Sequence, residues 1–240
     1  MTMKINIIGK GNVATNLEYA FAKKGIDCTM VSSREGLEDI PTNADVYVYA
    51  VRDEALEEVI NKVHVANRAL HVHTSGSMPI TVFGNDKQHV GIFYPFQTFT
   101  KTHVIEDFSK VPVFFEAKAI DDISAIYSLA LMITNHVYET TQKERERLHV
   151  AGVFANNFTN LMYTYASELL ANTHIPFSVL LPLIDETALK IHSMNPKAAQ
   201  TGPAKRQDKN VMQHHLEILP TEEQKKVYEM LSEAIGKRSL

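Results

Sequence analysis

The sequence contains a single cysteine, Cys28, among its 240 residues. One thiol excludes an intramolecular disulfide framework and is typical of a protein kept in a reducing compartment. The excess of one sign of charge is also small, because the net charge is −4 at neutral pH and no long basic run occurs. Nucleic acid is therefore not an expected partner, since such partners select a strongly basic surface.

Long hydrophobic runs are missing as well. The longest apolar stretch, residues 127–134, is much shorter than the roughly 20 residues that span a bilayer. The N-terminus enters a strand pattern directly, without the pattern of a signal peptide. We therefore expect a cytoplasmic protein that does not contact a membrane.

A glycine-rich turn near the N-terminus is the strongest motif present. Gly9, Gly11 and Ala14 form the pattern G-x-G-x-x-A between a short apolar run and residues with helical spacing. Gly9 permits a tight turn, Gly11 lets backbone N–H groups approach a diphosphate, and Ala14 allows close packing of helix and sheet. The helix start at Asn12 and Val13 would direct unpaired N–H groups at the phosphates. We predict a dinucleotide site here, with a plain glycine turn as the alternative.

The first half of the chain alternates short β-like segments with helical patterns, which is typical of a doubly wound parallel sheet. Strands are expected at residues 5–8, 28–32, 46–50, 69–73, 89–94, 111–115 and 136–140. Helices are expected after Gly11, after an N-cap at Asp53, and over residues 123–132. We therefore predict an α/β fold whose Rossmann domain covers residues 1–140.

The second half lacks strand patterns. Apolar residues recur at helical spacing over residues 142–172, which predicts one long helix. A second helix, a polar loop at residues 195–207 and two closing helices follow, the last with a capping box of Thr221 and Gln224. Residues 141–240 are thus predicted to form an all-α domain for substrate binding or dimerisation. A homodimer is expected, because the long helix has more apolar surface than one partner layer requires.

No acidic residue follows the second expected strand until Glu35. A carboxylate at that position would accept hydrogen bonds from the 2′-hydroxyl of NAD. The chain instead has Ser32, Ser33 and Arg34, two hydroxyls and a guanidinium that suit a 2′-phosphate. We therefore expect NADP as the cofactor, and a polar surface turn is the alternative.

These motifs resemble the NADP-binding half of the superfamily of 6-phosphogluconate dehydrogenase, β-hydroxyacid dehydrogenases and pyrroline-carboxylate reductase. More closely, the chain resembles a bacterial family, provisionally described as NADP oxidoreductases, that joins a Rossmann-like domain to a helical domain of unknown function. The matching segments are 9–14, 33–34, 50–53, 73–76, 94–99, 151–158, 201–206 and 208–215. This resemblance implies a fold and a cofactor but no substrate. Relatives usually carry proline where this chain has Arg52.

Lysine is absent between Lys143 and Lys190, where dehydrogenases of the superfamily carry a catalytic lysine, so that mechanism does not transfer to this chain. One polar face of the expected long helix carries Arg145, His149, Gly152, Asn156 and Asn160. His149 is the expected acid or base, because histidine titrates near neutral pH. Asn156 is expected to assist it, and a solvated helix face is the alternative.

Residues 73–76, His-Thr-Ser-Gly, follow another expected strand at the sheet edge where α/β proteins bind ligands. They are similar to the Ser-Gly loops that hold a substrate carboxylate in β-hydroxyacid dehydrogenases. Ser75 is therefore a candidate catalytic residue and His73 a candidate substrate ligand, with a capped turn as the alternative. His71 and His73 share one side of the strand, but no further ligand has metal-binding spacing, so no metal site is expected.

Together, these features predict an oxidoreductase that transfers a hydride between NADP(H) and a small, anionic metabolite. The nicotinamide is expected near Ala50 and Val51. Gln97 would orient the substrate with Ser75, and Arg206 would neutralise its carboxylate or phosphate. A non-catalytic NADP(H) sensor is the alternative from another class, which the missing lysine favours. A deazaflavin-dependent reductase is a further enzyme alternative, because some relatives carry that label.

Overall fold

The computed structural model describes residues 3–37, 40–65 and 68–238. The chain divides into two compact units, Met1–Phe154 and Ala155–Leu240. The first unit includes the helix α4 (Gln142–Gly152), which lies beyond the predicted boundary at residue 140. No described helix is long and apolar enough to cross a membrane.

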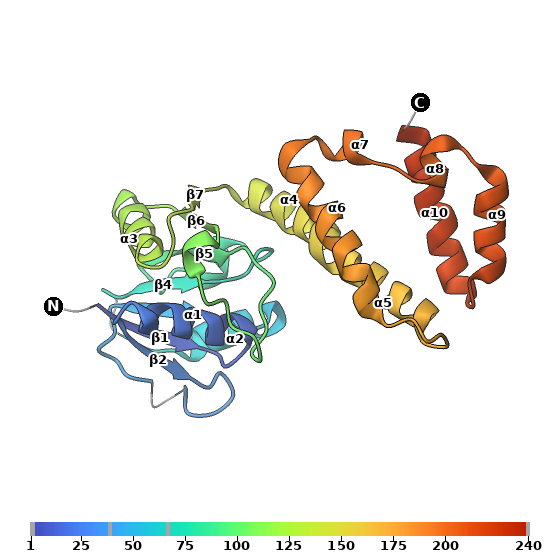
Figure 1. Ribbon diagram of the computed structural model, residues 1–240. Coiled ribbons are helices and arrows are strands. Elements are labelled where there is room, and N and C mark those ends of the chain that lie inside the picture. Colours follow the sequence, from blue (N-terminus) through green and yellow to red (C-terminus); the bar gives the residue numbers. More distant parts are fainter. Residues whose placement is uncertain (1–2, 38–39, 66–67, 239–240) are drawn as a thin grey trace. The chain divides into compact units, whose positions relative to one another are not determined.

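The first unit is built on a seven-stranded sheet with the strand order β2-β1-β3-β4-β5-β6-β7 (Figure 1). Its strands are β1 (Lys4–Ile8), β2 (Asp27–Val31), β3 (Val46–Tyr49), β4 (Leu70–His73), β5 (His89–Pro95), β6 (Val113–Ala117) and β7 (Val137–Glu139). Neighbouring strands are parallel except β5 and β6. Every predicted strand is present, with small shifts at the ends. The α/β Rossmann prediction is confirmed.

Helices cover both faces of this sheet. On one face lie α1 (Asn12–Lys23) and α3 (Ile120–Leu131). On the other lie α2 (Asp53–Lys62) and the 3₁₀ turn η2 (Ile80–Phe83). Because both faces are covered, β3 is buried at every residue and has no polar alternation.

The start of α2 differs slightly from the prediction, which made Asp53 the N-cap. The residue at the N-cap is Arg52, and Asp53 lies in the first turn. A carboxylate in the first turn interacts favourably with the positive end of the helix dipole. Asp53 therefore stabilises the helix start without capping it.

The chain crosses from β1 to β2 on one side and then returns past β1 to β3. This reversal of direction creates a topological switch point between the carboxyl ends of β1 and β3. Open α/β sheets bind their ligands at this point. The glycine turn at Gly9 follows β1 and therefore lies at the switch point.

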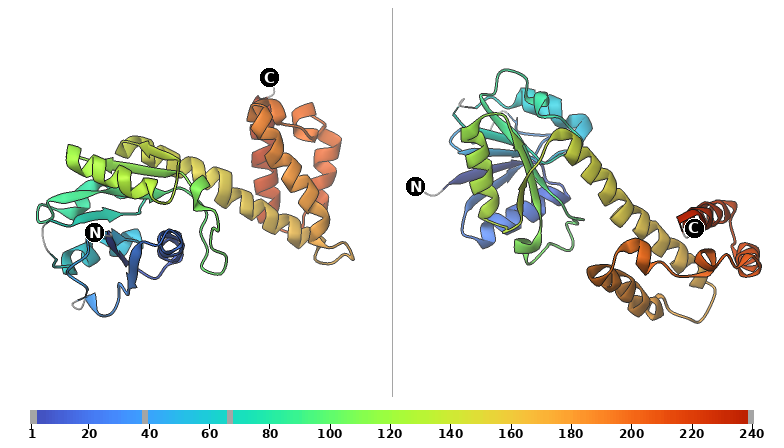
Figure 2. Two further views of the ribbon diagram at one scale, coloured as in Figure 1. Left: turned by 60° about the vertical axis from the view of Figure 1, so that its left-hand side comes forward. Right: turned by 90° about the horizontal axis from the view of Figure 1, so that it is seen from above.

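After β7 the chain is helical. A capping box of Thr141 and Glu144 starts α4, and a π-helical turn, η4 (Val153–Phe158), and α5 (Thr159–Leu170) continue it (Figure 2). The predicted long helix is thus confirmed with one interruption. A π-helical turn closes i→i+5 hydrogen bonds. The residues of the expected polar face before and after this turn therefore do not keep the spacing of one α-helix.

The second unit continues through η5 (Phe177–Leu180), α6 (Leu181–Ser193), α7 (Pro196–Ala199), α8 (Pro203–Arg206), α9 (Lys209–Ile218) and α10 (Glu222–Arg238). The prediction of a loop over residues 195–207 is wrong in part, because α7 and α8 lie within it. Each of these short helices begins with proline, whose missing N–H is not needed in the first turn. At the start of α10 the capping box is half formed. Thr221 Oγ1 accepts a bond from the Gln224 N–H at 3.2 Å, but the Gln224 side chain donates to Glu168 instead.

Candidate functional site

A cavity of about 750 Å³ lies at the carboxyl ends of β1, β2, β3 and β4. All nine residues predicted to bind the cofactor line it, namely Gly9, Gly11, Asn12, Val13, Ser32, Ser33, Arg34, Ala50 and Val51. Three separate turns supply them, and the fold brings these turns together at the switch point. The volume of the cavity lies within the range of roughly 300–1,000 Å³ that is usual for ligand sites.

Gly9 is required by the geometry of this cavity. Its φ angle is +127°, and a Cβ at this position would lie 2.3 Å from the carbonyl oxygen of Ala50. Any side chain would therefore push β3 away from β1. Gly11 is the N-cap of α1 and has an extended conformation. Because Gly11 has no side chain, the N-terminus of the helix stays accessible.

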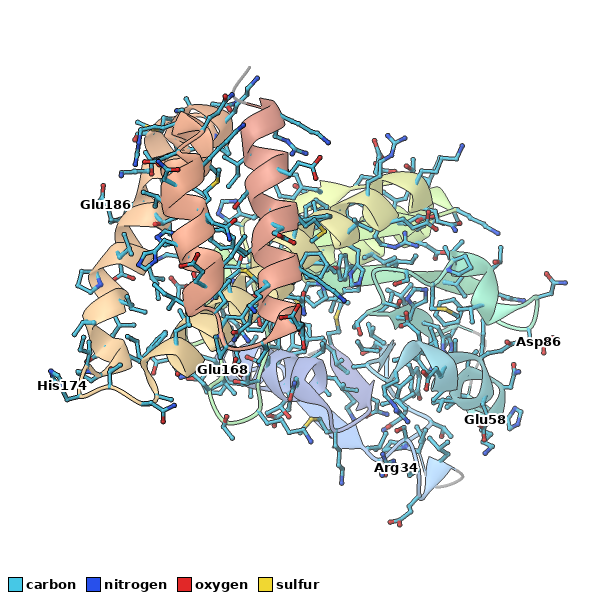
Figure 3. The ribbon with its side chains drawn as sticks, turned by 90° about the vertical axis from the view of Figure 1, so that its right-hand side faces the viewer. Arg34, Glu58, Asp86, Glu168, His174 and Glu186 are labelled. Atoms are coloured by element: carbon cyan, nitrogen blue, oxygen red, sulfur yellow. The ribbon has the colours of Figure 1, made fainter. Side chains whose placement is uncertain are left out.

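One end of the cavity is formed by the turn after β2 and by α2. The backbone N–H of Arg34 donates to Ser32 Oγ at 3.2 Å. On α2, Glu58 forms an ion pair with Lys62 at 2.5 Å, and both line the cavity. Arg34 and Glu58 both lie at the surface of the first unit (Figure 3). This end therefore offers two cations and one carboxylate to a ligand.

The sequence analysis missed Lys10, Lys62 and Lys101, which also line the cavity. Lys101 belongs to the segment after β5. Asn16, a fully buried residue of α1, holds this segment against the helix. The Asn16 amide donates to the Thr100 carbonyl at 2.9 Å, and its Oδ1 accepts from the Ile105 N–H at 2.8 Å. No short motif signals this contact, because Lys101 is far from the glycine turn in sequence.

A second group of residues surrounds the loop after β4. Thr74 lines the cavity, and Gly76, two residues later, contacts α4. A Cβ at Gly76 would lie 2.6 Å from Nδ1 of His149 and 2.9 Å from Cζ of Tyr94. The Tyr94 hydroxyl and His149 Nδ1 are hydrogen-bonded at 2.9 Å. The structure therefore brings His149 to the loop that borders the cavity, and it adds Tyr94, which the sequence analysis missed.

Ser75 caps the turn in this loop. Its Oγ accepts hydrogen bonds from the N–H groups of Ser77, at 3.1 Å, and Met78, at 3.0 Å. This geometry is that of a capped turn, which was the alternative to a catalytic role for Ser75. The hydroxyl proton of Ser75 is still available as a donor.

His73 is completely buried. Its Nδ1 accepts from the Ser75 N–H at 3.2 Å, and its ring stacks on Phe83. Burial, together with the charge of Arg145, lowers the pKa of His73 to about 4. A direct contact between His73 and a substrate is therefore not supported, and the ring stabilises the loop instead.

His71 is also part of the core. Its Nδ1 is hydrogen-bonded to the Tyr49 hydroxyl at 3.0 Å, and the ring stacks on Tyr47. Burial is the main cause that lowers the pKa of His71 to about 4. Within the described part of the chain, no group of three or more His, Cys, Asp or Glu residues could hold a metal ion.

Arg145 has no exposed surface, although the sequence placed it on the polar face of the long helix. Its guanidinium forms an ion pair with Glu116 and donates to the Met78 carbonyl oxygen at 2.7 Å. This pair fixes α4 to β6 and to the loop after β4. Arg145 therefore positions α4, and with it His149, against β6 and the loop after β4.

Three further predicted residues are exposed. Gln97 is bonded through its side-chain oxygen to the Thr98 N–H at 2.8 Å. Asn156 lies in η4, and Arg206 is the last residue of α8. Asn156 and Arg206 belong to the second unit. The roles of all three stay predictions.

The fold and its cavity define a Rossmann protein with a ligand-sized opening at the dinucleotide-binding edge of the sheet. The family model described as a domain of unknown function, DUF2520, matches residues 111–235, which is more than half of the chain. The chain belongs to this family. No curated protein matches it at a significant level.

Three solved structures are similar to this chain. A protein of Bacteroides fragilis, provisionally described as an NADP oxidoreductase, is 37% identical over 98% of both chains, with a TM-score of 0.92. The protein TM1727 of Thermotoga maritima is 16% identical over 98% of both chains, with a TM-score of 0.73. An imine reductase of Myxococcus stipitatus, in complex with NAD⁺, is 14% identical over 99% of this chain and 93% of its own, with a TM-score of 0.54. The last two similarities concern the fold alone.

Proposed function

We propose that this protein is an NADP(H)-dependent oxidoreductase in which His149 exchanges a proton with a small carbonyl or imine substrate. The contact between His149 and Gly76 is the observation that carries the proposal. Gly76 shares its loop with Thr74, which lines the cavity. A proton-exchanging group and a cofactor cavity thus border the same short loop.

The residues of the cavity fit NADP. The N-terminus of α1 would bind the diphosphate, with Lys10 and Lys101 as additional cations. Ser33 and Arg34 would bind the 2′-phosphate, since arginine forms charge-assisted bonds with phosphate. The description of the Bacteroides relative supports this assignment. When bound, the cofactor supplies the hydride.

The chain itself supplies orientation and a proton. The His149 side chain is exposed, so a substrate can approach its ring. A positioned general acid contributes roughly 10²–10⁴-fold to such a reaction. Ser75 and Gln97 would orient the substrate. Asn156, which would assist His149, and Arg206, which would neutralise an anionic group of the substrate, keep the roles that the sequence predicts.

The decisive experiment compares the wild type with His149→Ala on a panel of 2-keto acids, 3-keto acids and imines, with NADPH as the reductant. We expect turnover to fall by roughly a hundredfold while the NADPH dissociation constant stays unchanged. The matched control is His174→Ala, because His174 is an exposed histidine of the second unit (Figure 3). Unchanged turnover in His149→Ala would reject the role of His149. A wild type that binds NADPH but reduces nothing would support the sensor alternative.

A further inference from the structure

The phenol of Tyr94 lies beneath the exposed imidazole of His149. Tyr94 is only 9% exposed, and its ring packs edge-on against Phe96 with centroids 5.9 Å apart. Its hydroxyl lies 2.9 Å from Nδ1 of His149. Gly76 makes this arrangement possible, because any Cβ there would collide with both rings. The two side chains therefore form one packed unit.

The hydrogen bond between Tyr94 and His149 can run from the phenol to the imidazole. Burial raises the pKa of Tyr94 to about 12, so the phenol is protonated at neutral pH. Within the described part of the chain, Nδ1 of His149 is the hydrogen-bond partner of this hydroxyl. A protonated phenol can donate to Nδ1, and in that case the proton of the neutral imidazole lies on Nε2.

The charge of the buried Arg145 acts on this phenol. Arg145 lowers the pKa of Tyr94, in opposition to burial, whereas Asp53 raises it. Arg145 cannot serve as a substrate ligand, because it is fully buried and bound to Glu116 and to the Met78 carbonyl. Its charge holds the pKa of Tyr94 below the value that burial alone would give.

We infer that Tyr94 and His149 form a proton relay in which Tyr94 resupplies the proton that His149 gives to the substrate. As the hydride reaches the substrate carbon, the Nε2–H bond of His149 breaks and a bond forms to the substrate oxygen or nitrogen. The O–H bond of Tyr94 breaks and Nδ1 takes its proton, so the imidazole stays neutral. The Tyr94 phenolate, which the charge of Arg145 stabilises, then regains a proton from solvent. The catalytic part of this inference rests on the proposed function, whereas the hydrogen bond and the tautomer do not.

The first test does not need a substrate. Nitrogen-15 NMR at a pH above the ordinary titration range of histidine should show Nδ1 of His149 as an unprotonated acceptor and Nε2 as protonated. Tyr94→Phe should shift the Nδ1 resonance as the hydrogen bond is lost. Gly76→Ala should give the same shift by forcing the rings apart. A wild-type ring protonated at Nδ1, or an Nδ1 resonance that Tyr94→Phe leaves unmoved, would overturn the inference.

The chain offers a matched control for this substitution. His215 and Tyr228 form the same kind of pair in the second unit, with Nδ1 and the hydroxyl 2.8 Å apart. Tyr228→Phe should change the His215 resonances and leave those of His149 in place. A His149 shift of equal size in Tyr228→Phe would mean that the signal reports general destabilisation, and it would overturn the assignment.

The second test uses any substrate that the panel yields. Tyr94→Phe should reduce kcat by roughly tenfold or more, with an unchanged NADPH dissociation constant. The solvent-isotope dependence of kcat should fit two moving protons in the wild type and one in Tyr94→Phe. A one-proton dependence in the wild type would overturn the relay. If the wild type turns nothing over, the proposed function fails, and the NMR test still decides the hydrogen bond and the tautomer.

Discussion

The two compact units bury their apolar residues to very different extents. In the first unit, Phe21 and Phe93 have no exposed surface, and buried residues cover both faces of the sheet. In the described part of the second unit, Ala204 is the one buried apolar residue. Leu183 is 65% exposed there and Met230 is 60% exposed. The first unit has a core of its own, whereas the described part of the second unit has large apolar side chains that are exposed.

This difference shows what a hydrophobic pattern does and does not specify. Both units have regular apolar spacing, and in both it predicted the main helices or strands, apart from α7, α8 and the π-helical turn. In the sheet, the partner layers lie nearby in the same chain, so the pattern and the burial agree. In the helices of the second unit, the pattern indicates which face is apolar but not which element packs against that face. The expected homodimer would supply that partner, and it stays a prediction.

The largest expected effect concerns the core of the first unit. Phe93→Ala should lower the free energy of unfolding by roughly 3–5 kcal/mol, because it removes a fully buried ring that contacts Phe21. Leu183→Ala should change the stability of the dissociated chain by less than about 0.5 kcal/mol. Urea denaturation at low protein concentration measures both. Equal losses would contradict the contrast between the two units.

Acid should destabilise the first unit through its buried histidines. The pKa of folded His71 is about 4, against 6.5 for an unperturbed histidine. Between these values the unfolded state binds more protons than the folded state, so stability falls as pH drops from about 6.5 to about 4. The expected loss for one histidine is about 3 kcal/mol over this whole range and about 2 kcal/mol between pH 7 and pH 5. Urea denaturation at pH 7 and pH 5 should show a smaller loss in His71→Asn than in the wild type.

Cofactor preference should depend on the first unit alone. Arg34→Ala should weaken NADPH binding by about 1.5–3 kcal/mol and leave NADH binding nearly unchanged, because a charge-assisted contact with the 2′-phosphate is lost. Arg206→Ala, in the second unit, is the matched control and should bind NADPH normally. Fluorescence titration with both cofactors provides the measurement. A wild type without preference for NADPH would show that Ser33 and Arg34 form only a surface turn.

The last expected effect concerns self-association through the apolar face of the second unit. In a homodimer, burying one leucine such as Leu183 contributes roughly 1.5–3 kcal/mol. Leu183→Glu should therefore weaken self-association without unfolding the chain. Light scattering should give about twice the 27.0 kDa of one chain for the wild type and a lower mass for the variant. A wild-type mass near 27.0 kDa would reject the homodimer.

The sequence by itself determined the parts of this protein that depend on neighbouring residues. The strand pattern, the turn at Gly9 and the polar turn at Arg34 are local, and each was recognisable from a few consecutive residues. Because α/β topology gathers strand ends at one edge, the nine predicted cofactor residues line one cavity.

Only the tertiary structure decided the features that join distant segments. It buried Arg145 against Glu116 on β6, placed Tyr94 under His149, and brought Lys101 to the cavity through Asn16. In the sequence, Arg145 has the same spacing as a solvated arginine, and Tyr94 matches an ordinary core residue of β5. Their roles depend on contacts between residues that are far apart in the chain, and local periodicity carries no information about such contacts.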